Sequence, residues 1–220
     1  MDYLGPQQAD FSNVRSLNLE FLGVLARRQS SALLAGLPGE LSQRVRALRP
    51  AQCERLAATP FLLFSFRERD DDYWERLLAA NAARDLFAGA SADEGQMRLI
   101  AAGLGFVWQL ARQNSYAARL ICGASLHWCE RLAERTLLDV VNVVAASDDV
   151  LVLREGADCA LWRKLLHSGI SNERQVRRAA HISALQYVLT SCRRADAPRL
   201  ATAARAGLSP SLRVADETRR

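Results

Sequence analysis

This chain of 220 residues is short of lysine, of paired cysteines and of long apolar runs. Only one of its 29 basic residues, Lys164, is a lysine. An arginine bias of this kind is typical of a GC-rich genome, so a basic composition alone does not indicate that the chain binds phosphate. Arginine nevertheless offers a planar fork of donors that suits carboxylates and phosphates.

The cysteines argue against a metal site or a disulfide framework. There are five, which is an odd number, and they form no CxxC pair or other zinc-binding spacing with histidine. We therefore expect free thiols in a reducing compartment, with no metal and no cofactor. The five are Cys53, Cys122, Cys129, Cys159 and Cys192.

Neither the first residues of the chain nor its apolar runs indicate an export signal or a membrane span. The first twelve residues lack both the basic and the apolar region of a signal peptide. The longest apolar run, 99–108, is much shorter than the roughly 20 residues that span a bilayer. The sequence therefore predicts a cytoplasmic protein with no membrane association.

Proline is absent from the whole stretch between Phe61 and Ala197, and strand-like alternation is scarce throughout the chain. Ala, Leu and Arg recur instead with helical spacing, so we predict an all-α fold with short N-terminal helices followed by longer ones. One isolated strand is expected at Val150–Leu153, and residues 60–67 fit either an extended or a helical segment. The helices are predicted at 12–29, 39–48, 51–59, 94–113, 115–133, 136–146, 158–168 and 172–192.

Composition also predicts where the chain divides. Residues 80–95 are rich in Ala, Asn, Gly and Ser, which favours a boundary there. We expect an N-terminal helical module at 12–80, a C-terminal helical domain at 93–192 with a basic last helix, and a flexible tail at 193–220. Gly103, Gly105 and Gly123 are expected inside helices, where they would permit close packing.

The sequence contains no decisive catalytic motif. The consecutive Asp70, Asp71 and Asp72 are expected to cap a helix start rather than to bind a metal. His127 and Cys129 stand two apart on a predicted helix, so they point to different sides and cannot form a nucleophilic pair locally. No P-loop, dinucleotide-binding, zinc-protease or nucleophile-elbow pattern is present. We therefore predict no enzyme and no small-molecule substrate. The alternative enzyme hypothesis places a pocket among residues 94–146, with Arg119 beside those two side chains.

Charge is concentrated in the last sixty residues. Residues 161–220 hold 12 Arg/Lys against 4 Asp/Glu, a balance of +8, whereas residues 1–160 hold 17 against 20, a balance of −3. Arg174, Arg177 and Arg178 stand at i, i+3 and i+4, and His181 continues the row. On a helix these four side chains share one face, opposite a stripe that includes Ile182, Leu185 and Leu189.

The same region has the form of two helices joined at Gly169. In a DNA-binding helix-turn-helix the second helix enters the major groove, and amide and guanidinium groups there suit base edges and phosphates. Three interpretations stay open: a solvated basic face, a docking surface for a protein, or a contact with DNA. The predicted contact residues are Asn172, Arg174, Gln175, Arg177, Arg178 and His181.

A family resemblance covers residues 17–67. The order and spacing of these residues, mostly of core type, resemble the FlhD subunit of the bacterial flagellar master regulator. The matching residues are Leu17-Asn-Leu-Glu-Phe-Leu22, Ala26-Arg27, Ser31-Ala32-Leu33, Ala47-Leu48, Gln52, Leu56-Ala57, Leu62 and Phe66-Arg67.

The resemblance implies a small all-α transcriptional co-activator that dimerises and acts together with a second subunit. The chain is about twice as long as an FlhD subunit, and no matched residue is a known DNA contact.

These observations predict a non-enzymatic regulatory or adaptor protein, in the manner of a bacterial transcriptional co-regulator. It would act through protein contacts, as a homo-oligomer or in a hetero-complex, and its basic helix would contact DNA or an acidic partner. The alternative hypothesis is an assembly or secretion-system accessory protein with no role at nucleic acid.

Overall fold

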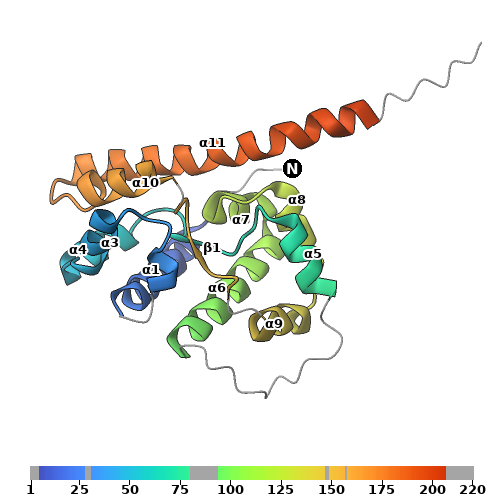
Figure 1. Cartoon of the computed structure of the whole chain (residues 1–220), viewed down its shortest axis with the longest axis horizontal. Helices are drawn as coiled ribbons and strands as arrows, with labels where there is room; N and C mark the ends of the chain where they lie inside the picture. Colours follow the sequence, from blue (N-terminus) through green and yellow to red (C-terminus); the bar gives the residue numbers. More distant parts are fainter. Residues whose placement is uncertain (1–4, 28–30, 80–93, 147–148, 157, 207–220) are drawn as a thin grey trace, which may run out of the picture.

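A computed structural model describes residues 5–27, 31–79, 94–146, 149–156 and 158–206. Helices dominate these residues, which confirms the predicted all-α fold, and α6 runs through the middle of the molecule (Figure 1). The elements in chain order are α1 (Gln8–Ala26), α2 (Ser31–Leu34), α3 (Gly39–Arg46), α4 (Pro50–Ala57), β1 (Phe64–Ser65), α5 (Asp71–Ala79), α6 (Glu94–Gln113), α7 (Ser115–Cys122), α8 (Leu126–Ala133), α9 (Leu137–Ala146), β2 (Val152–Leu153), α10 (Cys159–Lys164), the π-helical turn η2 (Leu165–Gly169) and α11 (Arg174–Ala206).

Local capping chemistry sets several helix starts. α1 begins four residues before the predicted position, because the backbone N–H of Gln7 donates to Asp10 Oδ2 at 2.7 Å and closes a capping box. The expected role of the Asp70–Asp72 run is confirmed at α5, where Asp70 Oδ1 accepts from the backbone N–H of Tyr73 at 3.0 Å.

The predicted helix at 115–133 is wrong, since the chain breaks it into α7 and α8. Gly123 has φ +61°, the left-handed conformation that ends a helix. A Cβ at this position would overlap Val188 of α11. α8 then restarts with Ser125 Oγ accepting from the backbone N–H of Trp128 at 3.0 Å. Glycine is needed here for the turn, and also for the close approach of α11.

Gly103 and Gly105, which are also expected to permit close packing, differ in the space around them. A Cβ on Gly103 would lie 2.7 Å from Phe66 Cζ, so the expected close packing is confirmed at that position. A Cβ on Gly105 would meet no atom within 4 Å, and the expectation is wrong there.

A short antiparallel pair joins two segments that are distant in sequence. β1 pairs with β2, with Phe64 opposite Leu153. The predicted strand at Val150–Leu153 is therefore confirmed over its last two residues, and its partner segment is extended rather than helical. The pair carries Arg154 into the interior, where its backbone N–H donates to Leu63 O at 3.2 Å.

One continuous core runs through both predicted domains. Phe21 of α1 and Phe64 of β1 have ring centroids 5.1 Å apart, and both belong to the cluster that includes Leu99 of α6 and Trp162 of α10. The described parts of the predicted segments 12–80 and 93–192 thus contribute to the same core. The boundary predicted at 80–93 lies outside the described residues.

Asn18 organises the N-terminal part of this core. Its side chain is fully buried and its Nδ2 donates to Ala57 O, Thr59 Oγ1 and Phe61 O at 3.3, 3.1 and 2.9 Å. Its Oδ1 accepts from the backbone N–H of Leu63 at 2.8 Å. One amide thereby pairs the polar groups of the turn between α4 and β1.

α11 is the longest described helix, and its C-terminal half runs past the helices of the body (Figure 1). It continues to Ala206, so the part of the predicted tail at 193–206 is helical, and 207–220 lie outside the described residues. Neither α11 nor any other helix in the described parts of the chain combines the length and apolar character needed to cross a bilayer.

Candidate functional site

The first turns of α11 present part of the predicted contact surface to solvent. Asn172, Arg174, Gln175 and Arg178 are all exposed. Arg174 and Arg178 stand one turn apart, and Ile182 follows one turn later with 46% of its surface exposed. We call Arg174, Gln175, Arg178 and Ile182, with Asn172 just before them, the α11 outer face.

His181 does not belong to this exposed surface, so the prediction that it extends the row toward solvent is wrong. Its side chain is only 7% exposed, and Nε2 lies 3.0 Å from Gly169 O. Burial lowers the pKa of His181 below its usual 6.5, and the positive charge of Arg177 lowers it further. His181 is thus a neutral group that ties α11 to η2.

Arg177 is also committed to the fold. It is half-buried, and its Nη1 donates to Ser171 O at 2.7 Å, which fixes the turn before α11. Its neighbour Val176 is 39% exposed, off the core side of the helix. The expectation that the apolar stripe lies opposite the basic row is wrong for Ile182, which follows Arg178 by one turn and is exposed, while Leu185 and Leu189 are half-buried.

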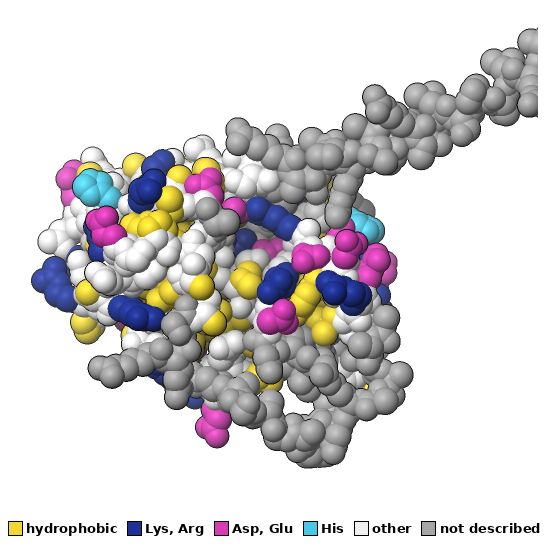
Figure 2. All heavy atoms as spheres, viewed as in Figure 1, with side chains coloured by type: hydrophobic (Ala, Val, Ile, Leu, Met, Phe, Trp, Pro, Cys, Tyr) yellow, Lys and Arg dark blue, Asp and Glu magenta, His cyan; other side chains and the backbone are white. Residues whose placement is uncertain are grey.

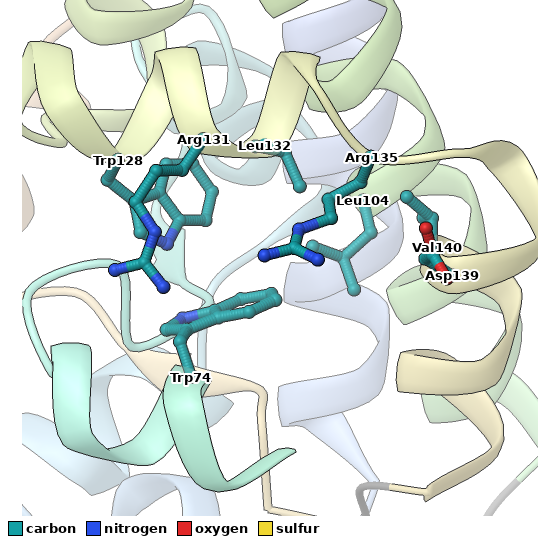
Figure 3. Close-up of a pocket in the computed structure, with 8 residues that line it drawn as sticks. All are labelled: Trp74, Leu104, Trp128, Arg131, Leu132, Arg135, Asp139 and Val140. Carbon is teal, nitrogen blue, oxygen red and sulfur yellow. The ribbon is translucent and has the colours of Figure 1, made fainter. Parts of the chain in front are cut away.

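A second surface feature, absent from the sequence predictions, is a pocket between α5, α6, α8 and α9 (Figure 3). The indole rings of Trp74 and Trp128 meet edge to face there, with centroids 5.4 Å apart. Trp74 Nε1 donates to Phe66 O at 3.0 Å, which fixes the orientation of its ring. Leu104, Leu132 and Val140 complete an apolar lining. We call this the Trp74–Trp128 pocket.

Two arginines stand at the rim of the Trp74–Trp128 pocket. Arg131 is in the last turn of α8, Arg135 follows α8 in the connection to α9, and both guanidinium groups point toward the ring of Trp74 (Figure 3). Arg131 Nη1 lies 3.7 Å from the exposed carboxylate of Glu75. Arg135 makes no ion pair with a described residue. Asp139 also lines the pocket, and its Oδ2 accepts from the N–H and Oγ1 of Thr136 at 3.0 and 2.9 Å. These hydrogen bonds lower the pKa of Asp139.

The residues of the alternative enzyme hypothesis differ in burial and lie outside the lining of this pocket. His127 is exposed whereas Cys129 is buried, and neither they nor Arg119 line the Trp74–Trp128 pocket. Within the described ranges no three His, Cys, Asp or Glu side chains gather as metal ligands would.

The most polar buried site is an ion pair that sequence reasoning missed. Arg154 and Glu68 are both about 2% exposed, and Arg154 Nη1 lies 2.9 Å from Glu68 Oε1. This contact has the distance of an ion pair without the geometry of a hydrogen bond. The guanidinium also donates to Leu62 O and Phe64 O at 2.5 and 2.6 Å. We call this arrangement the Arg154–Glu68 centre.

Most polar atoms of the Arg154–Glu68 centre pair with their own neighbours, and Glu68 Oε1 meets Arg154 as an ion pair without a hydrogen bond. Glu68 Oε2 accepts from Ser65 Oγ and from the backbone N–H of Phe66 at 2.5 and 2.7 Å. Arg154 O accepts from Trp162 Nε1 at 2.8 Å. The pair thus joins β1, β2 and α10, and its role is to hold these segments together.

Comparisons with protein-family models, with curated proteins and with solved structures find no match to this chain. The residues that resemble FlhD serve mainly as core, since Leu17, Asn18, Leu56, Leu62 and Phe66 are buried. The function must therefore be argued from the two surfaces described above.

Proposed function

We propose that this protein is a cytoplasmic, non-enzymatic adaptor or regulator that binds an acidic partner protein through the α11 outer face. The observation that carries the proposal is the exposed Ile182 on the same side of α11 as Arg174 and Arg178. Arginine together with exposed apolar side chains is typical of protein interfaces, where guanidinium groups pair with acidic partners.

The number of available cations favours a protein over DNA as the partner. His181 is buried and Arg177 donates to backbone carbonyls, which leaves two guanidinium groups of the predicted row exposed. Specific DNA binding draws much of its affinity from the neutralisation of several phosphates. An interface with two arginines and one apolar anchor needs no such array.

The surrounding surface agrees with recognition by a mixed interface. Figure 2 shows basic and acidic side chains interspersed over one face of the molecule, with apolar atoms between them. Such a surface favours specific pairing of charges over attraction to a polyanion. The resemblance to FlhD supports the regulatory form of this proposal, in which the chain works inside a protein complex at a promoter.

Charge reversal tests the proposal. The double variant Arg174→Glu, Arg178→Glu should lose a partner protein in affinity capture from an extract of the source organism treated with nuclease. The variant Arg46→Glu, Arg49→Glu carries the same charge change on two exposed residues, the last of α3 and the N-cap of α4, and should keep that partner.

The result distinguishes a protein partner, a nucleic acid and a merely solvated surface. Loss in the α11 variant alone supports the proposal, and the identity of the protein separates a regulatory complex from an assembly accessory. A partner that disappears on nuclease treatment indicates DNA or RNA instead. Retention of every partner by the α11 variant means that the basic face is only solvated surface.

A further inference from the structure

The Trp74–Trp128 pocket and the α11 outer face lie on different elements, so the pocket requires its own explanation. Both indoles belong to the core, and they also line a concavity. The cavity volume is about 20 Å³, which is room for about one methyl-sized group or one water. A separate small molecule needs far more space, whereas the tip of a protein side chain fits.

Apolar surface continues from the pocket onto the start of α9. Leu137 and Leu138 are 56% and 61% exposed, and the next two residues, Asp139 and Val140, line the pocket. Two adjacent exposed leucines beside an aromatic pocket form the kind of apolar surface that proteins use for docking. A partner that filled the pocket would also cover these leucines.

The two arginines at the rim of the pocket favour a partner with negative charge. Arg131 at the end of α8 and Arg135 in the connection to α9 both direct a guanidinium group toward the pocket, where carboxylates of a partner can pair with them (Figure 3). The contact of Arg131 with Glu75 is long and solvent-exposed, so it is weak. Asp139 caps α9 through Oδ2 and interacts electrostatically with Arg135 without a direct ion pair.

We propose that the Trp74–Trp128 pocket is a second docking site, which takes the tip of an aliphatic side chain from an acidic, amphipathic helical segment of a partner protein. The anchor enters the pocket beside the two indoles, neighbouring carboxylates of the same segment pair with Arg131 and Arg135, and a further apolar residue covers Leu137. This arrangement is helix-in-groove recognition, in which anchors recur at i, i+3 or i+4.

A random peptide library displayed on phage and selected against the full-length chain tests this proposal. Counter-selection uses the support without protein, and the variant Val140→Ile, which places one more methyl group in the pocket, is reserved for the binding measurement. The peptides that remain should be enriched in leucine or isoleucine with Asp or Glu one turn away. Binding of a selected peptide, followed by fluorescence anisotropy, should weaken about tenfold in Val140→Ile, the loss expected on removing one anchor contact.

Charge reversal at Arg135 tests the rim of the pocket without changing a core side chain. Arg135→Glu should also weaken the selected peptide about tenfold, an effect comparable to the loss of a charge pair at an interface. A synthetic copy of the peptide with Lys in place of its acidic residues should reverse this preference and bind Arg135→Glu better than wild type.

The outcome is separable from that of the proposed function. The α11 variant Arg174→Glu, Arg178→Glu should bind the selected peptide as wild type does, whatever it does to the partner in the extract. Basic peptides, peptides that bind Val140→Ile equally well, or a library with no enriched sequence would each overturn the proposal.

Discussion

Arginine has opposite roles in the Arg154–Glu68 centre and on the α11 outer face. In the centre, one guanidinium meets a buried carboxylate and two backbone carbonyls, and little of it reaches solvent. On α11, Arg174 and Arg178 are exposed beside an apolar side chain. The comparison teaches that the net charge of a segment says little about binding, because burial and partners decide what each cation does.

The largest effect on stability is expected at the Arg154–Glu68 centre. Arg154→Met leaves Glu68 as a buried carboxylate without its cation and leaves Leu62 O and Phe64 O without their donor. We expect a loss of about 3–5 kcal/mol in the free energy of unfolding. Chemical denaturation measures it. Adding Glu68→Gln to this variant should recover part of the lost stability. If nothing is recovered, the unpaired Glu68 carboxylate is not the cause of the loss.

A smaller loss is expected when the Asn18 amide is removed. Asn18→Ala leaves buried carbonyls and the Leu63 N–H unpaired, so we expect a cost of about 2–3 kcal/mol. Asn18→Asp keeps the shape but replaces the Nδ2 donor by an acceptor that faces Ala57 O and Phe61 O. It should be no more stable than the alanine variant, and wild-type stability of Asn18→Asp would contradict the hydrogen-bonding role.

Gly123 and Gly105 form a matched pair for a third prediction. Gly123→Ala should cost at least about 1–2 kcal/mol, because φ is positive and the new Cβ would overlap Val188. Gly105→Ala in α6 meets no atom within 4 Å and should instead stabilise the protein by about 0.5–1 kcal/mol. Thermal unfolding compares the two. Equal effects would show that α11 does not pack closely on Gly123.

His181 gives the smallest of the stability effects, one that depends on pH. Its pKa is lowered in the folded state, so the unfolded chain binds the proton more readily. Stability from neutral His181 is full above its usual pKa of 6.5 and falls as the pH drops below that value. The groups that face the ring are Gly169 O, the backbone of Ala58 and the guanidinium of Arg177, which opposes protonation.

The matching measurement is a series of thermal unfolding curves between neutral and mildly acidic pH. Wild type should lose more stability on acidification than His181→Gln, which keeps a hydrogen-bonding side chain without a titrating ring. Parallel curves for the two proteins would mean that His181 is not buried in the folded state.

Much of the fold could be predicted from helical spacing and capping residues. α6 was predicted at its observed bounds because an acidic start and a long proline-free apolar pattern are local signals. The break at Gly123 was missed because a glycine in an otherwise helical pattern gives no sign of positive φ. It depends on Val188, 65 residues away, which only the tertiary structure brings near.

The candidate surfaces were predicted less completely, for a physical reason. Helical spacing correctly placed Arg174, Arg177, Arg178 and His181 on one side of α11, but spacing does not say which part of that side another element covers. η2 covers His181, and the turn before α11 occupies Arg177. The Trp74–Trp128 pocket was missed because its walls come from four helices, and no single stretch of sequence carries the pattern.

The most direct test of the proposed function is photo-crosslinking from the α11 outer face. Benzoylphenylalanine in place of Gln175, in the full chain inside the source cell, should crosslink to one discrete protein, and the same label in place of Arg46 should not. The product should resist nuclease and should vanish when Arg174→Glu and Arg178→Glu are added. Crosslinks to nucleic acid, or none from position 175, would contradict the proposal that this face binds an acidic partner protein.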